Sequence, residues 1–257
     1  MAERQLGVCF SGGGARGIAH LGVLQALLES GLPIGHVTGV SSGAIAAAFH
    51  AAGFAPREVL GLLADTRFLR LVRPSFSRGV LQLEQLQKLY AHYLGPDRTF
   101  AELAVPLTLA VTDLGAGETL YYERGLLIPP LLGTTTVPVL CRPVEYEGRL
   151  LVDGGVMNNL PVEPLLDRSH LLTVGVHCNP FTNELPLTSL REISERTAYL
   201  AILMNTLPRL ARCHFVVEPP ELRHFKVTDL RRANELFDIG YAHTLTRLPA
   251  LRQQLMA

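Results

Sequence analysis

The first fifty residues alternate between short apolar runs and helical patterns, and this order restricts the fold more than any other feature of the sequence. Residues 6–10 form an apolar run that ends at Ser11-Gly-Gly-Gly14, and a helical spacing of apolar residues continues to about residue 29. A second strand-like run at 36–40 leads into an alanine-rich helical stretch at 41–52. A strand–helix–strand–helix order of this length predicts a βαβ unit with parallel strands and a right-handed crossover.

The rest of the chain extends the same alternation. Further strands are predicted at 106–111, 119–122, 149–152 and 171–177, and helices at 57–66, 82–94, 189–211 and 229–246. Of the 257 residues, 48% are hydrophobic and 18% charged, which is enough apolar material for a full core. Because no repeat or long linker interrupts the pattern, we predict one single domain over residues 1–257. Its fold class is α/β, with three layers, α/β/α, and a largely parallel central sheet.

The charge balance excludes several classes of partner. The 23 basic and 23 acidic residues cancel, so the chain lacks the positive charge with which proteins hold nucleic acid. No polybasic cluster is available for an anionic membrane, and no run reaches the roughly 18 apolar residues of a spanning helix. We therefore expect no nucleic-acid partner and, at most, peripheral contact with a membrane.

The cysteines and the N-terminal residues favour a reducing compartment. Cys9, Cys141, Cys178 and Cys213 are widely spaced and form no C-x-x-C pair, which argues against a disulfide framework. The sequence enters an apolar strand without the pattern of a signal peptide. We expect a cytoplasmic protein, at most peripheral to the inner face of the membrane. Histidines and carboxylates show no metal-ligand spacing such as H-E-x-x-H, so we expect no metal and no cofactor.

Three short turns carry the residues of a candidate site. They are Gly12-Gly-Gly-Ala-Arg-Gly17, Gly39-Val-Ser-Ser-Gly43 and Asp153-Gly154-Gly155, and each follows a predicted strand. In a parallel sheet the carboxyl ends of the strands lie along one edge, where ligands bind, and neighbouring strands are only about 5 Å apart. The pattern therefore predicts that the three turns meet at one edge.

The turn around Ser41 has the form of a nucleophile elbow. In a G-x-S-x-G segment between a strand and a helix, a strained backbone exposes the serine hydroxyl. Gly39 and Gly43 would allow the close packing of strand against helix that this turn needs. The alternative is a glycine-bounded turn in which a serine, Ser41 or Ser42, caps the following helix.

The glycine turn after the first strand fits three interpretations. Residues 12–17 match the dinucleotide-binding pattern G-x-G-x-x-G, but that site needs a carboxylate at the end of the second strand, which here ends in Gly39-Val-Ser41. The amides of Gly12, Gly13 and Gly14 could instead hold the oxyanion of an acyl transfer. A purely structural turn is the third interpretation.

Arg16 and His177 each leave two interpretations open. Arg16 lies in the first helical turn, where the helix dipole disfavours a cation, so it either pairs with a carboxylate or contacts an anionic head group. His177 ends a predicted strand, and it could complete a Ser–Asp–His triad with Ser41 and Asp153. The alternative is an imidazole that is satisfied within the core.

Taken together and in this order, G-G-G-x-R-G, G-x-S-x-G and D-G-G resemble the patatin-like phospholipase family. The resemblance extends from about Gly7 to the segment Asp238-Ile-Gly-Tyr-Ala, and Ala110-Val-Thr-Asp-Leu, Thr136-Val-Pro-Val and Asn158-Asn-Leu-Pro-Val agree with it. It implies a patatin-like fold and a catalytic dyad, with Ser41 as nucleophile and Asp153 as general base. It also implies an oxyanion hole made of the amides of Gly12, Gly13 and Gly14.

The function that the resemblance implies is hydrolysis of an ester bond in a lipid, through an acyl-enzyme. The expected substrate is a phospholipid, a lysophospholipid or another lipid ester. Because aspartate is a weak base for a hydroxyl, we expect burial to raise the pKa of Asp153. A catalytically silent module that binds lipid stays open.

One segment departs from the family pattern. Before Pro138 such proteins often carry an Ala-Ser pair, where this chain has Thr134-Thr-Thr-Val137. The segment helps to shape the acyl pocket, so the resemblance does not predict the preferred chain length. The apolar, proline-rich stretch 125–140, to which it belongs, is either ordinary core or a mobile wall of the cleft that touches the lipid surface.

Overall fold

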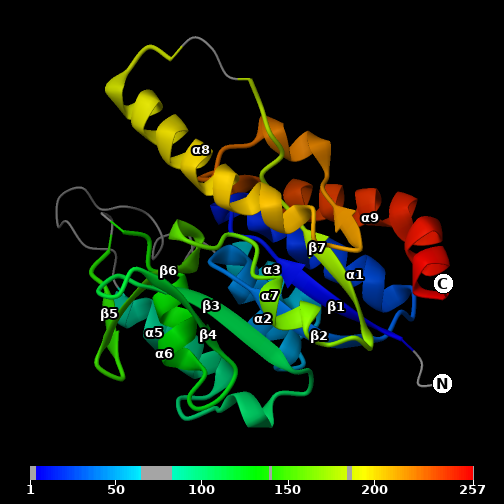
Figure 1. Ribbon diagram of the computed structural model, residues 1–257, viewed down its shortest axis with the longest axis horizontal. Helices are drawn as coiled ribbons and strands as arrows, with labels where there is room; N and C mark the ends of the chain where they lie inside the picture. The colour runs from blue at the N-terminus through cyan, green and yellow to red at the C-terminus, as the bar shows by residue number, and fades with distance from the viewer. Residues whose placement is uncertain (1–3, 65–82, 139–140, 184–186, 257) are drawn as a thin grey trace.

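A mixed sheet of eight strands runs through the part of the protein that the computed structural model describes, residues 4–64, 83–138, 141–183 and 187–256. Its order is β5-β6-β3-β2-β1-β7-β8, and β4 pairs with β3 outside that path (Figure 1). The strands are β1 Gln5–Phe10, β2 Ile34–Gly39, β3 Leu107–Asp113, β4 Glu118–Tyr122, β5 Val144–Tyr146, β6 Arg149–Asp153, β7 Leu171–Val176 and β8 Phe215–Val217. The run from β3 through β2, β1 and β7 to β8 is parallel, whereas β4, β5 and β6 pair antiparallel.

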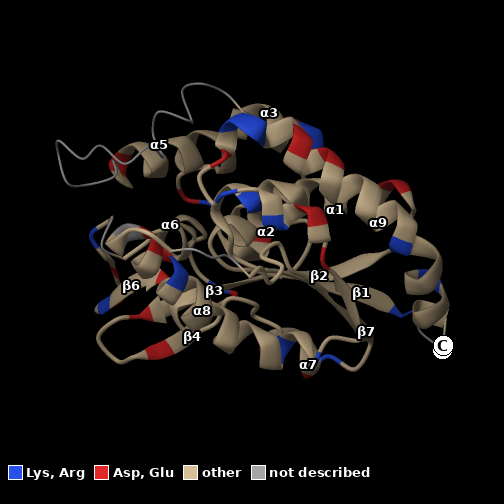
Figure 2. Ribbon diagram, turned by 90° about the horizontal axis from the view of Figure 1, so that it is seen from above, with Lys and Arg blue, Asp and Glu red and all other residues tan. Residues whose placement is uncertain are grey.

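Helices cover both faces of this sheet. They are α1 Ala19–Glu29, α2 Ser42–Ala51, α3 Pro56–Ala64, α5 Leu83–Leu94, α6 Ile128–Thr134, α7 Glu163–Leu166, α8 Leu190–Leu210 and α9 Ala233–Met256. Seen from above, α1, α2, α3 and α9 lie on one side of the strands and α7 and α8 on the other (Figure 2). Basic and acidic residues are interspersed along these helices (Figure 2). The predicted three-layer α/β/α fold is confirmed.

The alternation of side chains along β1 explains the two core regions. Leu6, Val8 and Phe10 point into the large core beneath α1, α2 and α9, whereas Cys9 points into a smaller cluster with Leu160 on the opposite face. Successive residues of a strand face opposite sides, so a strand covered on both faces is apolar throughout. The continuous apolar run at the start of the sequence is therefore a buried central strand.

Most of the predicted elements occur within a few residues of their predicted bounds. The last helix continues to Met256, through Pro249, instead of ending at 246. Residues 65–66 and 82, at the ends of two predicted helices, lie outside the described residues. The pattern did not indicate β5, β8, α6 or α7, because each has only three to seven residues, too few for a period to show.

The edge of β3 decides where the site forms. β4 pairs with β3 along Leu109–Asp113 and so occupies one edge of that stretch. On the other edge, β2 pairs as far as Leu109, and β6 pairs from Val111 to Asp113. Each stretch of a strand edge can hydrogen-bond only one neighbouring strand. β2 and β6 therefore pair with consecutive stretches of the same edge of β3. Their carboxyl ends therefore meet beside Ala110.

The parallel arrangement, on which the predicted meeting of the three turns at one edge rests, does not extend to the strand that ends at Asp153. β6 runs antiparallel to β3, and Asp153 is paired with Val111. Asp153 nevertheless reaches the end of β2, because two strands of opposite direction that share one edge bring their carboxyl ends together. Strand direction depends on pairing between distant segments, which apolar periodicity does not report.

The C-terminal end of α6 and the residues that follow it hold the two strand ends together. The hydroxyl of Thr134 accepts the amide N–H of Ser41 at 3.0 Å and donates to the carbonyl of Ala110 at 2.6 Å. The carbonyl of Thr136 accepts the amide N–H of Asp153 at 2.9 Å. The threonine segment that departs from the family pattern therefore holds the backbone on both sides of the joint.

Replacing Gly154 with alanine tests how closely the joint is packed. A methyl group there would lie 2.4 Å from the carbonyl oxygen of Ala110 and 2.8 Å from Cγ2 of Val40. We expect Gly154→Ala to lower the free energy of unfolding in urea by about 1–3 kcal/mol. Gly61→Ala is the matched control, since nothing lies within 4 Å inside α3, and it should raise stability by about 0.5–1 kcal/mol. A neutral Gly154→Ala variant would mean that β6 can move away from β3 freely.

Thr134→Val tests the link between α6 and Ser41. Valine keeps the shape of the fully buried side chain but removes the acceptor of one hydrogen bond and the donor of another. We expect a loss of about 1–3 kcal/mol in the free energy of unfolding, because the Ser41 amide and the Ala110 carbonyl lose their partner. Thr197→Val, on the exposed side of α8, should change stability by less than about 0.5 kcal/mol. Equal losses in the two variants would contradict a special role for Thr134.

Candidate active site

Ser41 adopts a backbone conformation that residues other than glycine rarely take. It joins β2 to α2 with φ 52° and ψ −125°. A methyl group on Gly39 would lie 2.6 Å from the carbonyl oxygen of Gly43, and one on Gly43 would lie 2.5 Å from that of Phe10. The two glycines thus let the helix approach the strands. A strained residue at such a turn costs about 1–3 kcal/mol and is typical of functional sites.

The side chain of Ser41 points to Asp153. Its Oγ donates to Oδ2 of Asp153 at 2.6 Å, and Oδ1 accepts the amide N–H of Gly155 at 2.8 Å. Ser41 is the N-cap residue of α2, but its hydroxyl makes no capping hydrogen bond. The geometry is therefore that of an elbow with a serine–carboxylate pair and not that of a capping serine.

Burial changes the acidity of Asp153. The side chain is 9% exposed, and removal from water raises its pKa to about 6, against the lowering effect of the hydrogen bonds from Ser41 and Gly155. A carboxylate with this pKa is a stronger base than one in water, and it is still largely ionised at neutral pH. The expected upward shift is therefore present.

The glycine turn lies directly against the nucleophile. A methyl group on Gly12 would lie 3.1 Å from Cβ of Ser41. Gly14 has φ 58° and opens the short 3-10 helix η1, Gly14–Ile18. Among the described residues the amides of Gly12, Gly13 and Gly14 donate to no protein acceptor, whereas the next amide, that of Ala15, bonds the Val227 carbonyl. A row of free amides beside a hydroxyl is suited to hold a negative oxygen.

Arg16 supports the turn from behind. Its Nε donates to the carbonyl of Phe225 at 2.7 Å, and one terminal nitrogen reaches Oδ1 of Asn179 at 3.4 Å. Asn179 in turn donates to the carbonyl of Gly12 at 2.6 Å. Arg16 is 8% exposed and pairs with no carboxylate among the described residues. The structure therefore places it in a polar chain that holds Gly12, and contact with a lipid head group stays a prediction.

His177 does not reach the serine–aspartate pair. It is buried at the end of β7, and its Nδ1 lies 3.6 Å from a carboxylate oxygen of Glu218. Among the described residues, the hydrogen bonds to the carboxylate of Asp153 are those from Ser41 and Gly155, so no imidazole bridges the carboxylate and the serine. The arrangement matches a dyad and lacks the contacts of a triad.

Sequence patterns missed several residues that shape the site. Thr134 and Asn179 are buried polar side chains whose partners are main-chain groups of the site turns. Asn205, on α8, contacts the turn that follows Asp153. A single polar residue in an apolar helix or after a strand gives no repeating signal. The one local hint is that Thr134 belongs to the segment that departs from the family pattern. In the sequence, that departure indicates a change in the acyl pocket, not a contact with the backbone.

The apolar stretch before Pro138 is mostly core. Its buried members are Leu127, Ile128, Leu131 and Leu132, whereas Leu126 and Val137 are 39% and 40% exposed. The interpretation of this stretch as ordinary core is favoured for its helical part.

Over the described ranges, no helix combines the length and the apolar character needed to cross a membrane, and no three potential metal ligands gather.

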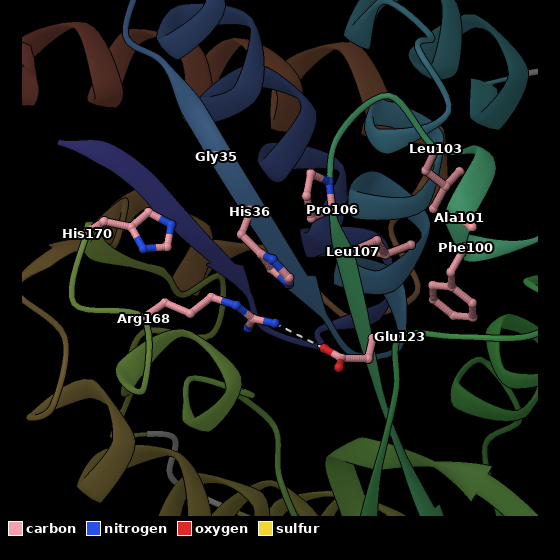
Figure 3. A pocket seen from close by; sticks show the side chains of 10 residues that line it. All are labelled: Gly35, His36, Phe100, Ala101, Leu103, Pro106, Leu107, Glu123, Arg168 and His170. Carbon is pink, nitrogen blue, oxygen red and sulfur yellow. Dashed lines mark hydrogen bonds and ion pairs between the residues drawn. The ribbon is translucent and has the colours of Figure 1, made fainter. Parts of the chain in front are cut away.

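A cavity of about 430 Å³ lies at the amino-terminal ends of β2 and β3, whereas Ser41 follows the carboxyl end of β2 (Figure 3). Arg168 and Glu123 form an ion pair of 3.1 Å across it. Burial lowers the pKa of His36 to about 4, and its Nε2 hydrogen-bonds the Thr108 hydroxyl. Arg168 and Glu123 are thus paired with each other, and His36 is paired with Thr108. Ser41 and Asp153 do not line this cavity.

Comparison with known proteins identifies the family and the fold of the chain. The family model described as patatin-like phospholipase matches residues 8–166. An uncharacterized NTE family protein of Mycobacterium tuberculosis is 35% identical over 178 residues, which are 68% of this chain but 49% of the relative, so the chain spans about half that relative's length. The Drosophila melanogaster protein named neuropathy target esterase sws is 25% identical over 94% of this chain and 19% of its own length. The crystal structure of VipD from Legionella pneumophila covers 96% of this chain and 67% of its own, with a TM-score of 0.57 and 18% identity, and so shares the fold. Because the family model spans more than half of the chain, the protein belongs to the patatin-like phospholipase family.

Proposed function

We propose that the chain is a serine lipid acyl hydrolase in which Ser41 is the nucleophile and Asp153 the general base. The single observation that carries the proposal is the hydrogen bond of 2.6 Å from Ser41 Oγ to Asp153 Oδ2, made by a serine held at positive φ. Strain that points a hydroxyl at a buried carboxylate has no evident use in folding. It is the geometry that nucleophilic catalysis requires.

The reaction begins with transfer of the hydroxyl proton to Asp153. As Oγ of Ser41 forms a bond to the ester carbonyl carbon, the carbonyl electrons move to its oxygen. The amides of Gly12, Gly13 and Gly14 hold this oxyanion, and one such donor is worth about 3 kcal/mol of transition-state stabilisation. Collapse expels the alcohol, which takes the proton from Asp153 and leaves an acyl-enzyme.

Hydrolysis of the acyl-enzyme repeats these steps with water. Asp153 accepts a proton from a water molecule, whose oxygen attacks the acyl carbon, and the same amides hold the second oxyanion. Collapse returns the proton to Ser41 and releases the fatty acid. The N-terminus of α2 lies behind Ser41, and its helix dipole favours the developing alkoxide.

The substrate class rests on the family and on the charge of the chain. The family is one of phospholipases, which hydrolyse ester bonds in lipids. The net charge of zero gives the chain no general attraction for a strongly anionic polymer. We expect a phospholipid, a lysophospholipid or another lipid ester, met at a peripheral membrane contact. The head group and the acyl position depend on pocket shape.

Labelling at Ser41 tests the proposal. An alkyl fluorophosphonate should phosphorylate Ser41 in the wild-type chain, and Ser41→Ala should remove both labelling and hydrolysis in a panel of lysophospholipid, diacylphospholipid and short-chain esters. His177→Ala should keep most of both, because His177 does not contact the dyad. Labelling elsewhere, or none, would exclude this mechanism and favour a silent lipid-binding module. Complete loss in His177→Ala alone would favour a triad.

The pH dependence of kcat/KM tests the role of Asp153. The base must be ionised to accept the proton, so activity should fall as pH falls, with an acid midpoint near the raised pKa of Asp153, about 6. Above that midpoint the rate should be level until another group titrates. Circular dichroism at each pH separates this limb from acid unfolding. A profile that stays flat to pH 4.5, about the range of a carboxyl group in water, would exclude Asp153 as the base.

A further inference from the structure

The side chain of Asn159 lies between the glycine turn and the turn that follows Asp153. Asn159 is 4% exposed. A methyl group on Gly12 would lie 2.4 Å from its Oδ1, and one on Gly155 would lie 2.8 Å from the same oxygen. The methyl group on Gly12 would also lie 3.1 Å from Cβ of Ser41. The amide of Asn159 therefore fills the space that the two turns and the nucleophile enclose.

One half of this amide has no partner. The Nδ2 group is buried and donates no hydrogen bond within the part of the chain that the structure describes. Leaving a buried donor without an acceptor destabilises the folded state, and native proteins contain few such groups. A donor of this kind beside a nucleophile is satisfied when a ligand supplies an oxygen.

The backbone of Asn159 is fixed by α8. Oδ1 of Asn205 accepts the amide N–H of Asn159 at 2.9 Å, and Nδ2 of Asn205 donates to the carbonyl of Gly155 at 3.1 Å. One side chain thus holds both ends of the turn 155–159. Although the main chain of Asn159 is held, its side-chain amide can still change by a half-turn about the Cβ–Cγ bond. This rotation exchanges the positions of Oδ1 and Nδ2.

We propose that Asn159 is a further catalytic residue of the hydrolase, which donates from Nδ2 to the oxygen that becomes negative in each tetrahedral intermediate. The inference rests on the proposed function. In the present orientation Oδ1 faces Gly12, where it would repel an oxyanion. A half-turn places Nδ2 beside Gly12, where it adds a donor to the glycine amides and can bond the oxyanion. The donor acts on the intermediate and not on Asp153, so the acid midpoint belongs to Asp153 alone.

Asn159→Leu tests the inference, because leucine has a similar volume and no donor. We expect kcat on a short-chain ester to fall by about 10²–10³, with KM changed by less than about threefold and the acid midpoint unchanged. Asn234→Leu, on the exposed surface of α9, is the matched control and should keep the wild-type kcat. A purely structural role would instead shift KM, the acid midpoint or the thermal stability. A kcat within about threefold of the wild type would overturn the inference.

A second measurement uses the wild-type chain and so does not depend on the folding of the variant. The alkyl fluorophosphonate adduct of Ser41 places a phosphoryl oxygen where the oxyanion forms. The assigned side-chain NH2 signal of Asn159 in nitrogen-15 NMR should move downfield and exchange more slowly in the adduct, and an unchanged signal would overturn the inference. A wild-type chain that hydrolyses no ester and is not labelled would overturn the proposed function, whereas an active chain with an unaffected Asn159→Leu variant would overturn this inference alone.

Discussion

The succession of β2 and β6 along one edge of β3 is the constraint on which the site depends. A parallel and an antiparallel strand share that edge, so their carboxyl ends face each other at Ala110. Each chain must then turn out of the sheet at the same place. Ser41 and Asp153 are the residues at which the turns begin, which is why side chains 112 positions apart come within hydrogen-bonding distance.

Close packing at this joint also sets its chemistry. Gly39, Gly43 and Gly154 lie where a methyl group would meet a carbonyl oxygen at 2.6 Å or less, so the backbone elements touch and exclude water. Exclusion of water raises the pKa of Asp153, and the hydrogen bond from Ser41 and the amide of Gly155 keep the carboxylate ionisable. A buried carboxylate without those partners would carry a large desolvation cost. The same packing that stabilises the sheet therefore produces a base.

Polar groups from distant parts of the chain complete the arrangement. Thr134 holds the Ser41 amide, Asn179 and Arg16 hold the glycine turn, and Asn205 holds the turn after Asp153. Asn179 and Asn205 lie beyond the residues 8–166 that match the family model. The C-terminal third of the chain thus contributes two of the supports, Asn179 and Asn205, of a site whose reacting groups come from the first two thirds.

The amino-acid sequence alone predicts the three-layer α/β fold and the residues of the turns, because apolar periodicity and glycine-bounded turns are local properties. It did not determine the direction of β6, nor the partners of Arg16 and Thr134. Those depend on which strand occupies the free edge of β3 and on which carbonyls and amides remain unpaired once the layers have packed. Such pairings join residues far apart in the chain. The order of the turns predicts that Ser41 and Asp153 meet, but the antiparallel β6 that brings them together and the side chains that support them emerge only from the packed fold.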